Sequence, residues 1–238
     1  MNEFVNLRNE CLMSSEQVNT DCVNYVTVEL VDRCIRKLKK GKACGPDNLC
    51  AEHLLFAHPS LVIHLQLLFS MILQHGFVPT DFGCGISIPL IKDKTGNVND
   101  VDNYRAITLS SVISKLFEMV VLDTCDDAVA TDSLQFGFKS SVGCMDAIFT
   151  LKSTVKYFID RGSSVFVASL DIKKAFDRVN HFKLYKSLLL AGIPVVIVDV
   201  LCDWYGKLCF VVRWNNAISR HFTVGSGVRQ GSCVSCNF

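Results

Sequence analysis

The sequence has almost no net charge and no hydrophobic run long enough to cross a membrane. Its 238 residues carry 24 Lys plus Arg against 23 Asp plus Glu, a net charge of +1. Any electrostatic attraction to nucleic acid must therefore come from a local basic patch and not from the net charge of the whole molecule. The longest apolar stretch, residues 61–73, contains His64, Gln66 and Ser70 and is shorter than the roughly 20 residues that span a bilayer. We expect a buried helix there and no membrane partner.

The chain also lacks the start of a secreted protein. Its first residues, MNEFVNLRNECLMSSEQ, carry acids and amides where a signal peptide needs a basic start and an apolar run. We therefore expect an intracellular location, either nucleus or cytoplasm, and no disulfide partner for the 12 cysteines. Cys233 and Cys236 form a CxxC pair, but no second pair stands at zinc-ligand spacing. Small buried hydrophobic side chains are the preferred interpretation of the cysteines, ahead of metal or redox chemistry.

Half of the residues are hydrophobic, which is enough for a packed core and excludes a disordered or collagenous chain. Apolar periodicity and capping residues predict helices from Thr27 to Gly41, Ser60 to Gly76, from Ser111 onward, and over 141–161, 181–190 and 194–204. Alternation predicts a strand over 86–92 and a hairpin over 207–225 that turns at Asn215 and Asn216. The segment SSVFVASLD, residues 163–171, is apolar on both faces and predicts a central strand covered on both sides.

Asp171, at the end of that expected strand, is the most conspicuous chemical feature. The GKACG segment lacks the spacing of a phosphate loop, GSGVRQG fails the dinucleotide fingerprint by one residue, and no Ser lies in a GxSxG turn. A carboxylate at the carboxyl end of a buried strand stands where open α/β sheets bind ligands. From position alone, a ligand role and a turn-capping role for Asp171 are equally favoured.

Five segments, in this order, resemble the reverse transcriptases of non-LTR (LINE-type) retrotransposons. They are KKGKACGPDNL, IPLIKDK with NYRAITLSSVISKLFEMV, LQFGFKSSVGCMDAI, SLDIKKAFDRVNH and GVRQGS. The resemblance implies an α+β, right-hand polymerase fold with fingers and an incomplete palm. It divides the chain into an N-terminal leader (1–26), a fingers-like region (27–140) and an incomplete palm (141–238). It implies an RNA-directed DNA polymerase that uses an RNA template, a DNA primer and deoxynucleoside triphosphates.

The resemblance also assigns site residues. Asp171 would bind the two Mg²⁺ ions of nucleotidyl transfer, and the carbonyl of Ile172 would add an oxygen. The residues implied to contact the nucleotide are Lys92, Arg105, Lys174, Ala175, Phe176, Gln230 and Gly231. Phe176 would exclude a ribose 2′-hydroxyl, with a plain core aromatic as the alternative. For Lys92, a solvated loop lysine is an equal alternative.

A basic cluster lies at the end of the first expected helix. Its members are Arg33, Arg36, Lys37, Lys39, Lys40 and Lys42. They are candidates for salt-dependent contacts to a template or primer backbone. A solvated basic helix end, favourable against the helix dipole, is equally supported.

The sequence departs from the family where further metal-binding carboxylates are expected. It has no aromatic-Ala-Asp-Asp motif, and its adjacent acids Asp126 and Asp127 lie upstream, in the wrong order. Asp177 is expected to fix a turn and not to bind metal, and YRAI stands where the family has YRPI. We expect a truncated enzyme that does not polymerise alone. The alternatives are a non-catalytic nucleic-acid-binding or interaction remnant, and an inert one.

Overall fold

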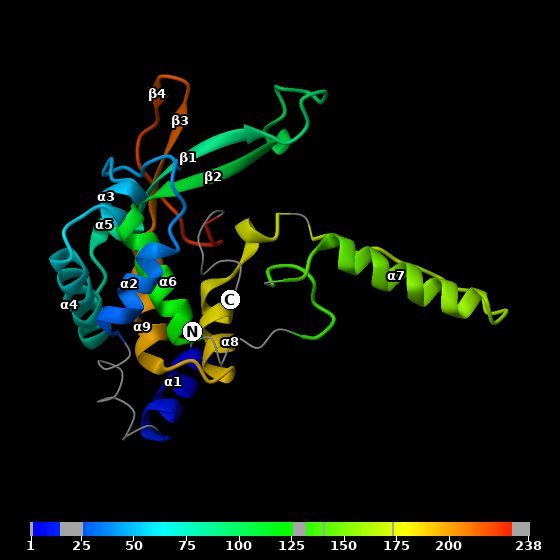
Figure 1. Cartoon of the computed structure of the whole chain (residues 1–238), viewed down its shortest axis with the longest axis horizontal. Helices are drawn as coiled ribbons and strands as arrows, with labels where there is room; N and C mark the ends of the chain where they lie inside the picture. Colours follow the sequence, from blue (N-terminus) through cyan, green and yellow to red (C-terminus); the bar gives the residue numbers. More distant parts are fainter. Residues whose placement is uncertain (1, 15–25, 126–131, 140, 173, 230–238) are drawn as a thin grey trace.

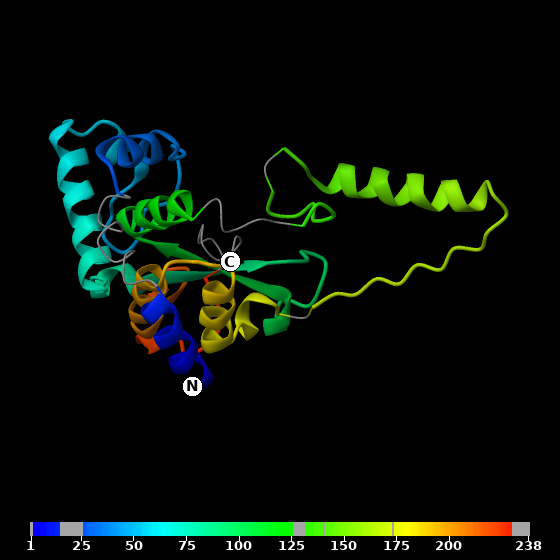
Figure 2. The ribbon, with the colours of Figure 1, turned by 90° about the horizontal axis from the view of Figure 1, so that it is seen from below.

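The computed structural model describes residues 2–14, 26–125, 132–139, 141–172 and 174–229. Most of them form a mixed α and β body in which a helical layer lies below a sheet (Figure 1). The expected α+β character is therefore confirmed. Helix α7 (Cys144–Ile159) lies apart from this body in two perpendicular views (Figures 1 and 2).

The helices of this layer form one connected group, in which α2 (Val28–Arg36) and α9 (Val195–Gly206) both pack on α4 (Ser60–His75). Helix α2 also packs on α6 (Val112–Thr124). Helix α9 also packs on α8 (His181–Leu190) and on the short α5 (Thr80–Gly83). The short α3 (Ala51–Leu55) lies against α2. Two other short elements are the 3-10 turns η2 (Val101–Asn103) and η3 (Phe176–Arg178).

The sheet has the strand order β2-β1-β3-β4, with β5 also paired to β3. Strand β1 (Cys84–Ile91) is antiparallel to β2 (Tyr104–Ser110) and parallel to β3 (Cys209–Trp214). Strands β4 (Ala217–Ile218) and β5 (Phe222–Thr223) are both antiparallel to β3. The expected strand over 86–92 and the hairpin over 207–225 are confirmed within a few residues at their ends, whereas the sequence analysis did not anticipate β2.

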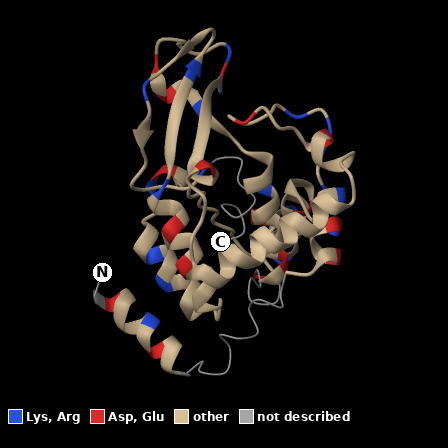
Figure 3. Ribbon diagram, turned by 90° about the vertical axis from the view of Figure 1, so that its left-hand side faces the viewer, with Lys and Arg blue, Asp and Glu red and all other residues tan. Residues whose placement is uncertain are grey.

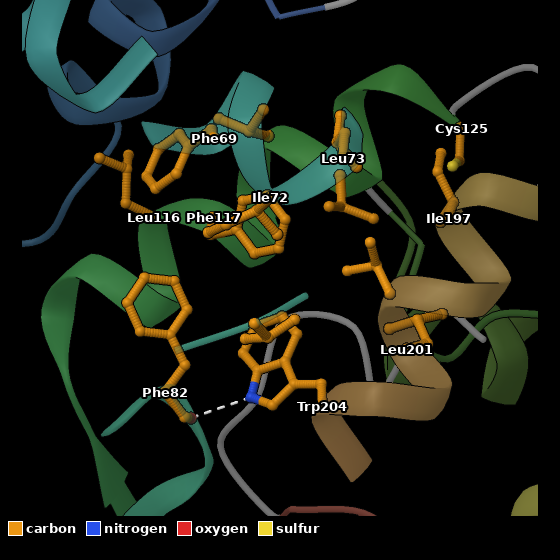
Figure 4. Packing of buried hydrophobic residues seen from close by; sticks show 14 of the residues in the cluster. Phe69, Ile72, Leu73, Phe82, Leu116, Phe117, Cys125, Ile197, Leu201 and Trp204 are labelled. Atoms are coloured by element: carbon orange, nitrogen blue, oxygen red, sulfur yellow. Dashed lines mark hydrogen bonds between the residues drawn. The ribbon is translucent and has the colours of Figure 1, made fainter. Parts of the chain in front are cut away.

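Aromatic side chains form the centre of the core (Figure 4). The ring of Phe117 on α6 lies 5.1 Å from that of Phe69 and 5.6 Å from that of Trp204. The buried indole of Trp204 donates a 2.9 Å hydrogen bond to the main-chain oxygen of Phe82. Since Phe69, Phe82, Phe117 and Trp204 come from four elements, this cluster ties α4, α5, α6 and α9 together.

Local signals placed several helix ends correctly. The hydroxyls of Thr27 and Ser111 accept hydrogen bonds from Leu30 N and Ile113 N, as N-cap residues do. Gly76 ends α4 with a φ of 62°, a left-handed conformation that glycine adopts without strain. Two details were wrong. Helix α2 ends at Arg36 and not at Gly41, and Ser60 is the first residue of α4, after Pro59 at its N-cap.

The N-terminal segment contains a helix that the sequence analysis did not anticipate. Helix α1 (Asn2–Ser14) packs against α8 and α9. Arg8 Nε and Arg8 Nη2 each donate a 2.7 Å hydrogen bond to the Asp199 carboxylate. This partner raises the pKa of Arg8. Phe4 packs on the rings of Phe182 and Tyr185. The division of the chain at residue 26 stays a prediction.

The expected central strand over 163–171 is wrong in this structure. These residues return from the far end of α7 to the body as extended chain without a strand partner (Figure 2). Phe166 and Leu170 are each 95% exposed, and no residue of α7 is buried. A strand exists only through hydrogen bonds to a neighbouring strand, and the described residues place none beside this segment. The apolar pattern was identified correctly, but its burial was not.

Candidate nucleotide and nucleic-acid site

The turn after Asp171 carries three of the seven residues implied to contact a nucleotide, Lys174, Ala175 and Phe176. Asp171, Ile172 and Ala175 are exposed, and Ala175 directly precedes η3. Lys174 has a φ of 57°, a left-handed conformation that is uncommon for a residue with a side chain. Phe176 is half-buried, and its ring lies 6.5 Å from that of Phe138.

The segment before Gln230 is hydrogen-bonded to this turn. The amide of Val228 donates to Phe176 O at 2.8 Å, and the amide of Gly227 donates to Val179 O at 2.8 Å. Gly227 has a φ of 83°, and a Cβ there would lie 2.9 Å from Phe176 O, so glycine is required by both conformation and space. Gln230 and Gly231 themselves lie outside the described residues.

The loop between β1 and β2 reaches the same turn. Lys174 Nζ lies 2.6 Å from the Asp102 carboxylate, which raises the pKa of Lys174. Lys92 Nζ donates a 2.7 Å hydrogen bond to the main-chain oxygen of Asp102. The structure therefore brings Lys92 and Lys174, which the resemblance assigns to the nucleotide, onto one residue that the sequence analysis did not single out.

A small cavity of about 220 Å³ opens between the sheet and this turn. Ser87, Ala106, Thr108 and Asp177 line it, together with Gly227 and Arg229. Arg105 is exposed on β2, opposite Leu90. Because consecutive residues of a strand point to opposite faces, Arg105 faces away from the side on which Ala106 lines the cavity. Its role in nucleotide binding stays a prediction.

The interior beside this turn holds two charged residues that the sequence analysis missed. Arg229 Nη2 and Glu118 Oε1 lie 2.6 Å apart, and both side chains are almost fully buried. The sequence contains a signal for Glu118, since it is the sole acidic residue among the mostly apolar residues 112–122. A carboxylate surrounded by apolar side chains needs a partner, but nothing local identifies Arg229 as that partner.

Ion pairs divide the basic cluster into two groups. Arg33 and Lys37 both contact the Asp123 carboxylate on α6, and Arg36 pairs with Asp32 at 2.7 Å. In contrast, Lys39 and Lys42 are exposed, and Lys40 lies 4.7 Å from the centre of the Phe56 ring. Basic and acidic residues are interspersed over the helices (Figure 3). Arg33, Arg36 and Lys37 thus have carboxylate partners, and the role of the cluster in phosphate contacts stays a prediction.

The cysteines agree in part with the interpretation as small apolar side chains. Cys34 and Cys125 are buried, Cys144 is exposed, and the other described cysteines are half-buried. Burial raises the pKa of the Cys125 thiol to about 11. Cys233 and Cys236 lie outside the described residues. Within the ranges that the structure describes, no three His, Cys, Asp or Glu side chains are arranged to hold a metal ion.

Comparisons with known proteins define the class. Residues 91–237 match the family described as "Reverse transcriptase (RNA-dependent DNA polymerase)". Since the match covers more than half of the chain, this protein belongs to the reverse transcriptase family. The expected α+β fold of a reverse transcriptase is confirmed at that level.

Individual relatives point to one group within the family. The chain is 31% identical over 218 residues to the RNA-directed DNA polymerase from mobile element jockey of Drosophila melanogaster, covering 89% of this chain and 23% of that protein. It is 26% identical over 217 residues to the probable RNA-directed DNA polymerase from transposon BS of the same species, covering 89% and 24%. It is also 25% identical over 191 residues to the Pol polyprotein of the element R2DM, covering 80% and 18%. The resemblance to non-LTR reverse transcriptases is confirmed, and the chain spans about a quarter or less of the length of these relatives.

No helix in the described part of the chain has the length and apolar character needed to span a bilayer.

Proposed function

We propose that this chain supplies the nucleotide-binding part of an RNA-directed DNA polymerase of a non-LTR retrotransposon. The observation that carries the proposal is the hydrogen bond from Val228 to Phe176 O. It joins the turn after Asp171 to the segment that leads into Gln230, two motifs separated by about fifty residues of sequence. Lys174 and Lys92 meet at the same place, on Asp102.

The donors on the turn suit magnesium. The carboxylate of Asp171 and the carbonyl of Ile172 are hard oxygen ligands, and Mg²⁺ takes one or two carboxylates together with waters and substrate phosphates. Bound there, Mg²⁺ would stabilise the charge of a triphosphate. Oxygens of the nucleotide phosphates and waters would add further ligands of such an ion.

The nucleotide would lie against Phe176, with Lys174 and the amide of Ala175 toward its phosphates. Lysine is a point charge suited to phosphate oxygens, and a bulky ring beneath the sugar favours a deoxyribose. Gln230 and Gly231 would contact the nucleotide from the segment that follows Arg229. An RNA template and a DNA primer would be held in part by Lys39, Lys40 and Lys42.

The test measures binding of dTTP to the purified 238-residue chain, in the presence of an RNA template, a DNA primer and Mg²⁺. Asp171→Asn is expected to weaken Mg²⁺-dependent dTTP binding at least about tenfold, because it removes the charged ligand. Asp160→Asn is the matched control, since it removes an exposed carboxylate near the far end of α7. Equal binding by the unaltered chain and Asp171→Asn would refute the assignment of Asp171.

A second candidate is a non-catalytic nucleic-acid-binding role. Its support is the exposed group Lys39, Lys40 and Lys42, together with the exposed position of Asp171. It predicts RNA binding that is insensitive to Asp171→Asn and abolished when the three lysines become Gln. The expectation that the chain does not polymerise alone stays a prediction. Mg²⁺-dependent extension of a primer by the purified chain, abolished by Asp171→Ala, would show it to be wrong.

A further inference from the structure

Arg229 and Glu118 form an ion pair inside the molecule, between the turn after Asp171 and the helical core. The exposed fractions of their side chains are only 3% and 2%. The two residues are 111 positions apart in the sequence, Glu118 on α6 and Arg229 directly before Gln230. The resemblance to non-LTR reverse transcriptases assigns neither of them a role.

Further contacts fix the orientation of the Arg229 side chain. Its Nη1 donates a 3.2 Å hydrogen bond to Phe82 O, which also accepts the hydrogen bond from the Trp204 indole. Its guanidinium carbon lies 5.2 Å from the centre of the Trp204 ring. A planar guanidinium donates in several fixed directions at once, whereas an ammonium group is a point charge. The contacts to Glu118, Phe82 and Trp204 therefore define both the position and the plane of this group.

Stability alone is a poor reason for such a pair. Moving two charges out of water is costly, and a well-packed apolar pair of similar volume is often as stable as a buried ion pair or more so. What an apolar pair lacks is directional bonding that holds the backbone at Arg229 in one place. The neighbouring backbone is held from the other side, because Gly227 and Val228 donate to Val179 O and Phe176 O. His181 Nε2 adds a 2.7 Å contact to Gly227 O.

We propose that Arg229, held by Glu118, is a positioning residue that keeps the backbone of Gly227 and Val228 against Phe176 and so sets the place of the deoxynucleoside triphosphate on the turn after Asp171. This inference rests on the proposed function and deepens it. Arg229 is buried and acts through the backbone that it holds, since Phe176, the residue proposed to lie under the nucleotide, accepts the hydrogen bond of Val228. The Arg229–Glu118 pair connects the proposed nucleotide site to α6 and to the aromatic core.

The test uses the whole chain and separates positioning from stability. The double variant Glu118→Leu with Arg229→Met removes both charges and keeps an apolar filling. Arg229→Lys keeps a positive charge beside Glu118 but loses the planar set of donors. Three quantities are measured: the urea midpoint of unfolding, the exchange rates of the Gly227 and Val228 amides, and the dissociation constant of dTTP with Mg²⁺. Arg8→Met is the control, because it breaks an ion pair between α1 and α9 that includes neither Arg229 nor its partners.

The double variant is expected to keep a urea midpoint close to that of the unaltered chain. Its Gly227 and Val228 amides are expected to exchange at least about tenfold faster, and its dTTP affinity to fall by about tenfold or more, as when a residue that orients a binding group is removed. Arg229→Lys is expected to show the same two changes. Arg8→Met is expected to change neither the exchange nor the affinity.

Unchanged amide exchange and dTTP affinity in the folded double variant would overturn the proposal. Apolar side chains would then hold the backbone of Gly227 and Val228 as well as the ion pair does. Failure of the double variant and of Arg229→Lys to fold would also overturn it, because the pair would then serve the fold as a whole. A lack of dTTP binding by the unaltered chain would count against the proposed function alone. The amide exchange rates are measured without nucleotide, so they test the positioning role of Arg229 independently of dTTP binding.

Discussion

Lys174 and Asp102 form an ion pair of 2.6 Å between the turn that follows Asp171 and the loop that joins β1 to β2. Lys92 donates to the main-chain oxygen of the same Asp102. Lys174, which is proposed to face the nucleotide phosphates, and Lys92 are therefore both in contact with one acidic residue in the free chain. A triphosphate and the Asp102 carboxylate would compete for Lys174, since both are anionic acceptors.

Asp102→Asn tests this competition. The variant is expected to lower the pKa of Lys174 toward its ordinary value, because the Asp102 carboxylate is the main cause of the raised pKa and Asp177 adds to it. It is also expected to bind dTTP about two- to fivefold more tightly at low salt, the range that the removal of one exposed ion pair allows. Glu29→Gln removes an exposed carboxylate from the first turn of α2 and serves as the control. Weaker dTTP binding by Asp102→Asn would show that Asp102 helps to hold the nucleotide instead.

Changing Lys39, Lys40 and Lys42 to Gln is expected to weaken RNA binding. It is also expected to make the binding constant less sensitive to salt concentration. For single-stranded RNA, each phosphate that a lysine no longer neutralises should reduce the slope of log K against log salt by about 0.7. The matched variant changes Arg33, Arg36 and Lys37 to Gln, which removes the same charge from side chains already paired with Asp123 and Asp32. Equally weakened binding in the two triple variants would show that ion pairing does not divide the cluster.

Phe117→Ala and Phe166→Ala are expected to differ sharply in stability. Phe117 is fully buried, and its removal should lower the free energy of unfolding by about 3–5 kcal/mol. Phe166 is 95% exposed, and its removal should change that free energy by less than about 0.5 kcal/mol. Urea unfolding followed by circular dichroism measures both. A large drop in stability from Phe166→Ala would mean that residues 163–170 are packed in solution and not exposed.

The free energy of unfolding is expected to fall at alkaline pH through Cys125. Burial raises the pKa of this thiol from 9.0 to about 11, so the thiol ionises more readily once the chain unfolds. Its contribution to stability is complete below pH 9.0 and disappears as the pH rises to about 11. Urea midpoints across this range should decline less in Cys125→Ala than in the unaltered chain. Cys144→Ala, at an exposed position, should decline as the unaltered chain does.

Several features of the fold were predictable because their causes are local. Thr27 and Ser111 cap their helices through hydrogen bonds to residues three and two positions ahead, and Gly76 ends α4 by its own conformation. Helix α8 was predicted with its observed bounds, His181–Leu190. In contrast, β2 was missed, since the polar residues before it favoured a loop and its pairing with β1 depends on the register of the hairpin.

The candidate site was predictable only as a set of motifs. Lys174, Phe176 and Gln230 could be named from the sequence, but the contact between Phe176 and Val228 could not. Asp102 was missed because its importance comes from the lysines around it and not from any pattern of its own. Arg105 was grouped with Lys92, although the strand alternation of β2 turns it away from the cavity.

The sequence by itself determined the family, through the order of its motifs, and the ends of helices, through interactions that span a few residues. Only the tertiary structure decided what residues 163–171 do, because an apolar segment becomes a buried strand only where another strand lies beside it. It also decided how the charges pair, since Arg33 meets Asp123 across 90 residues and Arg229 meets Glu118 across 111. Which charged residues become partners depends on how distant segments of the chain pack together, and no local pattern of residues contains that information.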